Sequence, residues 1–265
     1  MITAGVDIGS TACKVVVLRD GAVVAAITGP SSFDPQRTAR EIYDRALAAA
    51  GAAADEVRCV VGTGYGRARV PFAAVNVSEL SCHARGAHHL VPSVRTVLDI
   101  GGQDVKALTV DANGNLVDFA MNDKCAAGTG RFLDVMARTL EIPVEDLGTL
   151  HARAGEACVI GNMCSVFAES EVLSLLNEGA PLPAIVKGLH LSLVSRVAAL
   201  ALRVGLEPDV VLTGGVARNA GVVDALAGRL GIALSRLPAG SDPQLVGALG
   251  AALVARDHVG ATEGA

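Results

Sequence analysis

Two cysteines, Cys125 and Cys164, each lie just ahead of a segment whose small residues and helical periodicity predict the start of an amphipathic helix. Thiolates at helix N-termini suit an anionic iron–sulfur cluster, because unpaired backbone amides and the helix dipole stabilise negative charge there. A cubane cluster needs four thiolates, whereas the chain offers two such sites. A symmetric dimer that takes two cysteines from each subunit would supply all four.

The other cysteines leave a second option open. The chain has six cysteines and no CxxC pair, which is typical of free thiols or ligands in a cytoplasmic protein. Cys13 and Cys59 fall within or beside apolar strands, where small buried side chains are expected. A metal site within one chain remains possible, although no close ligand spacing of the zinc type supports it. Its ligands would be Cys82, Cys125, Cys158 and Cys164.

Two glycine-bearing loops follow predicted strands, GSTACK at residues 9–14 and GGQD at residues 101–104. Glycine lets backbone amides approach phosphate oxygens closely, and Ser10 and Thr11 add hydroxyl donors. Neither a Walker GxxxxGK[ST] loop nor a correctly placed Rossmann GxGxxG turn is present. The loops therefore indicate a nucleoside triphosphate site of another type.

Acidic residues lie beside both loops. Asp7 and Asp99 open them, and we expect these carboxylates to hold magnesium through water while the metal bridges phosphate oxygens. Asp104 is the candidate for orienting the attacking water, with a turn-capping role as the alternative. The spacing of His83, His88 and His89 matches no zinc motif, and these side chains are expected to pack in a helix over residues 78–90.

The order of elements predicts an α/β fold whose pattern occurs twice. Superposing Asp7-Ile8-Gly9 on Asp99-Ile100-Gly101 brings Lys14 onto Lys106 and places a hairpin after each. The strand ends at residues 61–64 and 212–215 match in the same way. Two related lobes facing each other would gather the glycine-bearing strand ends around one cleft, a usual place for a ligand.

Composition excludes several classes. The net charge of -5 and the 3% aromatic content argue against nucleic-acid binding. The apolar stretch LVGALGAALVA falls short of the roughly 18 residues that span a membrane, and the helix-periodic segment at residues 188–205 is expected in the core. Because the chain begins directly with a strand, we expect no signal peptide and a cytoplasmic location.

Seven motifs in this order resemble the ATP-dependent activators of 2-hydroxyacyl-CoA dehydratases, and the likeness covers nearly the whole chain. They are GVDIGSTACK, VGTGYGR, SELSCHA, VLDIGGQDVK, MNDKCAAGTGRFLD, CSVFAESEV and VVLTGGVARN. The cluster-ligating cysteines of that group fall in the contexts of Cys125 and Cys164. The wider group includes the ATPase subunits of benzoyl-CoA reductases. It belongs to the superfamily of acetate and sugar kinases, actin and the heat-shock chaperones, whose fold is a pair of ribonuclease-H-like lobes.

The resemblance implies an ATPase coupled to electron transfer: an oxygen-sensitive homodimer with one 4Fe-4S cluster at its interface. Reduced ferredoxin or flavodoxin would reduce the cluster, and the protein would pass single electrons to a dehydratase. The implied nucleotide residues are Ser10, Thr11, Ala12, Cys13 and Lys14 in the first loop, Gly101, Gly102 and Gln103 in the second, then Gly214, Gly215 and Gln244. Cys13 departs from the group, whose members carry serine there, so nucleotide affinity would change if this side chain touches phosphate.

The expected division is a first lobe at residues 1–92 and a second lobe at 93–244 that carries the cluster cysteines. A C-terminal helix at about 245–265 can pack back on the first lobe. Three alternatives remain: a subunit of a benzoyl-CoA reductase or another cluster-protein reductase, a sugar or acyl kinase, and a chaperone-like or filament-forming ATPase. The last two have no use for the two cysteines.

Overall fold

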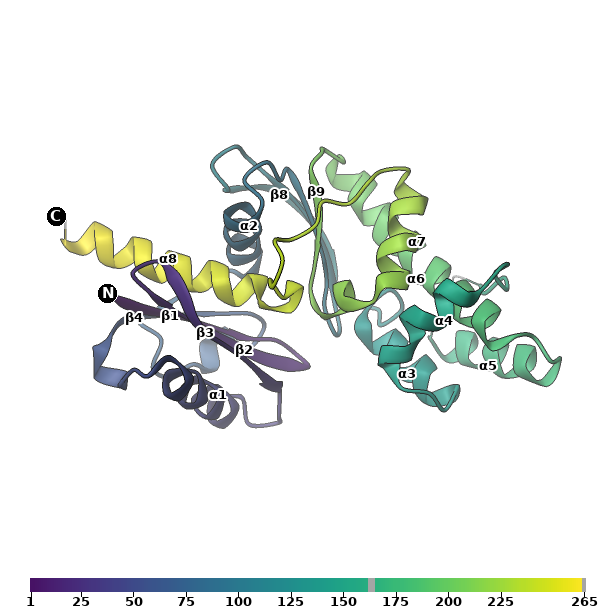
Figure 1. The fold of residues 1–265 in the computed structure, drawn as a ribbon, viewed down its shortest axis with the longest axis horizontal. Coiled ribbons are helices and arrows are strands. Elements are labelled where there is room, and N and C mark those ends of the chain that lie inside the picture. Colours follow the sequence, from purple (N-terminus) through teal and green to yellow (C-terminus); the bar gives the residue numbers. More distant parts are fainter. Residues whose placement is uncertain (162–164, 264–265) are drawn as a thin grey trace.

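The computed structural model describes residues 1–161 and 165–263, so Cys164 lies outside the described residues. Two sheets, each covered by helices, lie side by side along the longest axis of the molecule (Figure 1). The first has the order β3 (Ala22–Pro30), β2 (Ala12–Arg19), β1 (Ile2–Ile8), β4 (Val57–Thr63) and β5 (Val75–Asn76). The second has the order β8 (Leu116–Asn122), β7 (Val105–Val110), β6 (Thr96–Ile100) and β9 (Val210–Thr213).

The strand register confirms the predicted duplication. Asp7 pairs with Lys14 across β1 and β2, and Asp99 pairs with Lys106 across β6 and β7. The prediction for the later strand ends was wrong by one residue. Asp7 pairs with Thr63 and Asp99 with Thr213, so the equivalent glycines are those that follow, Gly64 and Gly214. The sequence alone could not fix this register, because each segment contains two glycines, Gly62 and Gly64 in one and Gly214 and Gly215 in the other, and they can be aligned in more than one way.

The first sheet is covered by α1 (Pro35–Ala50) on one face and by α8 (Val246–Glu263) on the other. Side chains alternate along β2, so Val15 faces the α1 side and Val16 faces α8. Asp34 caps the N-terminus of α1, because its side chain accepts a hydrogen bond from Arg37 N at 3.1 Å. The helix ends at Gly51, whose φ of 58° is left-handed, a conformation that glycine adopts readily at helix ends.

Helix α2 (Glu79–Leu90) covers the second sheet rather than the first. Its Ala84 and Ala87 pack with Val97 and Leu108, while its backbone lies against α8 closely enough that a side chain at Gly86 would clash with Val246 O. The chain therefore passes between the lobes twice, at α2 and again at α8 (Figure 1). The division at residue 92 stays a prediction.

The other face of the second sheet carries a helical layer. It comprises α3 (Gly130–Thr139), α4 (Leu147–Arg153), α5 (Ser165–Asn177), α6 (Leu182–Val204) and α7 (Ala220–Leu230). By length and composition α6 could cross a membrane, but 61% of its most apolar window is buried inside the protein, and it is a core helix as predicted. Short 3-10 turns complete the fold at Ala54–Glu56, Arg67–Arg69, Val144–Asp146, Gly215–Arg218 and Pro243–Leu245.

Candidate nucleotide site and cluster cysteine

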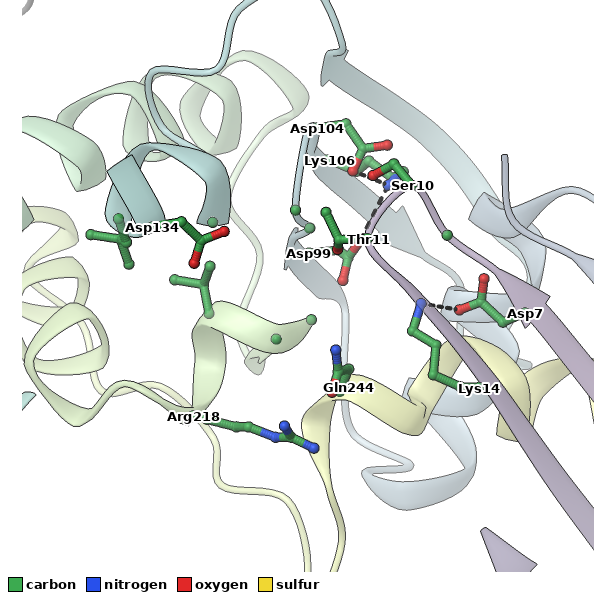
Figure 2. A pocket seen from close by; sticks show the side chains of 18 of the residues that line it. Asp7, Ser10, Thr11, Lys14, Asp99, Asp104, Lys106, Asp134, Arg218 and Gln244 are labelled. Carbon is green, nitrogen blue, oxygen red and sulfur yellow. Dashed lines mark hydrogen bonds and ion pairs between the residues drawn. The ribbon is translucent and has the colours of Figure 1, made fainter. Parts of the chain in front are cut away.

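A cavity of about 380 Å³ lies between the two lobes, where the equivalent loops of both sheets meet (Figure 2). The residues that line it include most of those predicted to bind nucleotide or magnesium. These are Asp7, Ser10, Thr11, Lys14, Asp99, Gly101, Gly102, Asp104, Gly214, Gly215 and Gln244. Residues far apart in the sequence are thus brought together, as the duplication predicts.

Ala12, Cys13 and Gln103 are not among the lining residues. The Cys13 side chain is fully buried in the core between the first sheet and α1, because successive residues of β2 point to opposite faces. Burial, and then the negative charge of Asp7, raise the pKa of its thiol to about 12. A phosphate contact through the Cys13 side chain is therefore excluded in this conformation.

Each lobe contributes one buried aspartate–lysine pair to the cavity. Lys14 Nζ lies 2.9 Å from Asp7 Oδ2, and Lys106 Nζ lies 3.3 Å from Asp99 Oδ2. Lys106 also contacts Asp104 Oδ1 at 2.8 Å and Glu79 Oε1 at 3.7 Å. Burial by itself would lower the pKa of both lysines, but the neighbouring carboxylates outweigh it and raise the pKa of each. Both ammonium groups are therefore charged, and both lysines line the cavity.

Asp99 is held by a set of neighbours from three elements. Thr213 Oγ1 donates to Asp99 Oδ1 at 3.0 Å, and His83 Nδ1 lies 3.6 Å from the same oxygen. Burial would raise the pKa of Asp99, but His83, Lys106 and the Thr213 hydroxyl lower it to about 2. Asp99 is therefore ionised at neutral pH despite its burial.

Sequence reasoning missed the wall of the cavity that α2 provides. Glu79 and His83 both line it, and they are four residues apart on one face of α2. His83 was expected only to pack, so its place beside Asp99 is a finding of the structure. The spacing of four residues between Glu79 and His83 places both side chains on one face of the helix. It does not show that this face lines the cavity until α2 is placed against the second sheet.

The two phosphate loops touch each other across the lobes. A Cβ at Gly102 would clash with the Thr11 side chain, so glycine allows this approach. The strand ends beside the aspartates need glycine for a second reason, because Gly64 and Gly214 have φ of 86° and 87°. A Cβ at either position would also strike the neighbouring aspartate or the backbone that follows it.

The far end of the cavity is suited to the nucleoside. Gln244 Oε1 is the one buried side-chain oxygen or nitrogen without a hydrogen-bond partner among the described residues, and Gln244 lines the cavity. Arg218, another lining residue, is held by Asp242 through its Nε at 3.0 Å and through Nη2. Figure 2 shows both side chains below the phosphate loops, with Asp134 of α3 on the opposite wall. An unpaired amide oxygen there can accept a hydrogen bond from a ligand.

The described residues contain no group of three or more histidine, cysteine, aspartate or glutamate side chains that could hold a metal ion directly. Asp7 and Asp99 each already accept a hydrogen bond from a lysine. This arrangement fits the predicted role, in which they would meet magnesium through water rather than as ligands.

Cys125 lies outside the nucleotide cavity, in the loop between β8 and α3, and is half-buried. Its Sγ is 3.9 Å from Arg196 Nη1 of α6. Cys82 is fully buried against α8, and burial raises the pKa of its thiol to about 12. Cys82, Cys125 and Cys158 form no metal-binding group within the part of the chain described, which gives the single-chain site no support.

The chain matches a known protein family along almost its whole length. The BadF/BadG/BcrA/BcrD ATPase family matches residues 4–255. The chain belongs to this family. It is 48% identical to the activator of lactoyl-CoA dehydratase of Anaerotignum propionicum over 259 residues, which cover 96% of this chain and 97% of the relative. It is 47% identical to the (R)-2-hydroxyglutaryl-CoA dehydratase activating ATPase of Acidaminococcus fermentans, with 96% of both chains covered.

A solved structure of a family member matches this chain almost throughout. The activator of the 2-hydroxyisocaproyl-CoA dehydratase from Clostridium difficile, with bound ADPNP, has a TM-score of 0.94 at 46% identity and covers 99% of this chain and 97% of that one. The resemblance to the dehydratase activators is therefore confirmed. A benzoyl-CoA reductase subunit of Thauera aromatica is a more distant relative, 36% identical over 85% of this chain and 82% of its own length.

The kinase-type fold is confirmed by a remote likeness. A ROK family glucokinase from Streptomyces griseus has a TM-score of 0.55 at 17% identity and covers 97% of this chain and 100% of that one. At this level of identity the likeness concerns the fold alone. It supports the two-lobed architecture and says nothing about a sugar substrate.

Proposed function

We propose that this protein is a cytoplasmic, ATP-hydrolysing electron carrier that activates a 2-hydroxyacyl-CoA dehydratase. The observation that carries the proposal is an inter-lobe cavity lined by two lysines, together with Cys125 in the loop before α3, a helix whose first residues hydrogen-bond to the second phosphate loop. The similarity to activators of three such dehydratases supports the partner. Ferredoxin or flavodoxin would be the electron donor.

The phosphate chain would lie between the two loops. Lys14 and Lys106 would contact phosphate oxygens, while backbone amides around Gly101, Gly102 and Thr11 would complete the cradle. Asp7 and Asp99 would hold magnesium through water, and a bound magnesium ion neutralises phosphate charge during hydrolysis. Asp104, held by Lys106, is the candidate for orienting the attacking water.

Gly214, Gly215 and Gln244 would face the adenosine. The unpaired Gln244 Oε1 would accept a hydrogen bond there. Ligand binding at this end would therefore satisfy an amide oxygen that is otherwise buried without a partner, which favours occupancy of the cavity.

The cluster would be bound by Cys125 and by Cys164, for which this remains a prediction. The surroundings of Cys125 fit an anionic group, because the side chain is half-buried and the positive Arg196 guanidinium points at its sulfur. A 4Fe-4S cluster needs four thiolates and would carry single electrons. Two subunits would have to supply them.

Exposed apolar side chains at Val159 and on α5 support such a dimer. Val159 is 88% exposed, and on α5 Val166, Phe167, Leu173 and Leu176 are 65%, 60%, 46% and 36% exposed. Several exposed apolar side chains on one helix are typical of a surface that binds another protein. Helix α5 lies at the end of the second lobe away from α8 (Figure 1), so a second copy could pack there without covering the first lobe.

Hydrogen bonds join the second phosphate loop to the start of α3, the helix that follows Cys125. Gly130 N and Arg131 N, at the start of α3, donate to Gly101 O and Gly102 O, each at 2.8 Å. Cys125 lies in the loop that precedes this helix, five residues before Gly130. A shift of the second phosphate loop on hydrolysis would therefore move the cysteine loop with it.

The energy involved explains why an electron carrier would use ATP. Moving one electron uphill by roughly 300 mV needs about 7 kcal/mol, since a tenfold change in equilibrium corresponds to about 59 mV. No single hydrogen bond supplies this amount. Closure of two lobes around a nucleotide rearranges many contacts at once and could supply it.

The test is anaerobic purification followed by iron and sulfide analysis, electron paramagnetic resonance and an ATPase assay. We expect about four irons per dimer and ATP hydrolysis. Cys125→Ala should lose the visible absorbance and the iron while retaining nucleotide binding. A wild-type protein without iron, or a C125A variant with full iron, would contradict the proposal.

A benzoyl-CoA reductase-type role is the second candidate, favoured by the 36% identity to the Thauera aromatica protein. It uses the same cavity and cysteines, so the partner decides between the two. Reconstitution with a 2-hydroxyacyl-CoA dehydratase component and with a benzoyl-CoA reductase catalytic component, measured as substrate turnover, distinguishes them. We expect turnover only with the dehydratase.

A further inference from the structure

Helix α6 connects the nucleotide cavity with Cys125 through two side chains. His190 is fully buried, and its Nε2 lies 3.2 Å from Nδ2 of Asn219, a residue that lines the cavity. Arg196, further along the same helix, reaches Cys125. The two positions are about 9 Å apart along the helix axis, given a rise of 1.5 Å per residue. A rigid helix therefore carries one contact to each region.

The contacts at the cavity end form a chain with a defined direction. Burial, and then the proximity of His151, lower the pKa of His190 to about 3, so its ring is neutral. His151 Nε2 lies 3.5 Å from Asp224 Oδ2 and donates there, which leaves its Nδ1 as the acceptor for His190 Nδ1 at 2.9 Å. His190 Nε2 then accepts from Asn219, whose Oδ1 caps α7 by accepting from Gly221 N and Val222 N.

At the other end, Arg196 supports the cysteine loop in two ways. Its guanidinium lies 3.9 Å from Cys125 Sγ, and its aliphatic stem lies beneath Gly128, where an added Cβ would come within 3.4 Å of Arg196 Cβ and Cδ. The guanidinium is positive at all relevant pH values. Positive charge and hydrogen bonds at a ligand sulfur stabilise negative charge and raise the reduction potential of an iron–sulfur cluster.

We propose that Arg196 is a positioning residue that holds the Cys125 sulfur and raises the potential of the group bound there, and that α6 makes this contact responsive to nucleotide through His190 and Asn219. The inference rests on the proposed function, because it needs a redox group at Cys125. It goes further by naming the residue that tunes this group and a route from the cavity to it.

The first experiment compares the reduction potentials of wild-type, Arg196→Gln, Arg196→Lys and Arg203→Gln proteins by anaerobic redox titration. Arg203 is an exposed residue near the end of α6 and serves as the matched control. We expect R196Q to bind the added electron about tenfold less favourably, a shift of ~59 mV to more negative potential. R196K should recover part of the shift, and R203Q should match the wild type.

The outcomes separate the two proposals. A wild type without iron overturns the proposed function and this inference with it. A wild type with four irons per dimer and an R196Q variant of unchanged potential overturns this inference alone. R196Q can also lose its iron while keeping wild-type circular dichroism and nucleotide binding. That loss supports the positioning role, and the reduction potential is then compared between R196K and the wild type.

The second experiment tests the route through α6 with Asn219→Ser. Serine can still cap α7, but its short hydroxyl cannot replace the contact with His190. The potential is measured with no nucleotide, with ADP and with the non-hydrolysable analogue ADPNP, each at saturation. We expect the nucleotide-induced shift to fall at least twofold in N219S. A shift equal to that of the wild type would show that α6 does not transmit the signal.

Discussion

At the scale of single residues, Cys13 shows how strand alternation decides a role that the motif leaves open. Its neighbours Ala12 and Lys14 face away from the core in which Cys13 lies, so only its backbone can serve a ligand. We predict that Cys13→Ser leaves nucleotide affinity unchanged by calorimetry. The buried hydroxyl should lower the free energy of unfolding by about 1–3 kcal/mol in chemical denaturation. A change in nucleotide affinity without a loss of stability would contradict this placement.

Asp104 is the second residue whose role depends on a particular contact. Its backbone oxygen accepts from Gly101 N at 2.9 Å, which serves the turn, while its carboxylate is held by Lys106. Asp104→Asn keeps the turn contact and removes the charge. We predict a kcat for ATP hydrolysis roughly 10²-fold lower with little change in nucleotide Kd, as expected for a water-orienting group. Asp44→Asn, at an exposed position of α1, is the control, and an unchanged kcat in D104N would assign Asp104 to the turn alone.

At the scale of elements, local signals gave most of the fold. The hairpins at Gly21 and Gly114, the end of α1 at Gly51 and the repeated Asp-Ile-Gly strands all follow from turn chemistry and periodicity, and the structure contains each of them. The cavity wall from α2 was missed because it depends on which sheet the helix covers. That choice is made by packing between residues distant in sequence, such as Ala84 with Val97.

The buried histidine of α6 gives this element a pH dependence that can be measured. His190 has a pKa of about 3 in the folded protein, below its ordinary value of 6.5. The unfolded chain therefore binds the extra proton first, and stability should fall as the pH drops from about 6.5 toward 3, by at most about 1.4 kcal/mol per pH unit. We predict that His190→Gln shows a shallower decline between pH 6.5 and 4 in denaturation midpoints. His258→Gln, at an exposed site, should keep the wild-type slope, and equal slopes in all three proteins would exclude His190 as the cause.

At the scale of the whole molecule, duplication explains why a cavity exists at all. Each lobe supplies one loop, one lysine and one aspartate, and neither half-site can surround a nucleotide without the other. The lobes are joined by α2 and α8, whose close contact depends on small residues such as Gly86 and Gly250. The motifs predict the half-sites, whereas this helical junction arises only in three dimensions. The junction leaves the far end of the second lobe open, which is where the proposed dimer would form.

That dimer can be tested through the exposed apolar side chains of α5. Phe167 is 60% exposed there, and a charge at this position would oppose packing against a second copy. We predict that Phe167→Asp is monomeric by anaerobic size-exclusion chromatography with light scattering and loses most of its iron, because one subunit supplies only two thiolates. Nucleotide binding should be retained, since the cavity lies within a single chain. Phe33→Asp, at an equally apolar and fully exposed position beside α1, is the matched control and should remain a dimer with full iron. A dimeric F167D protein with an intact cluster would place the interface elsewhere on the molecule.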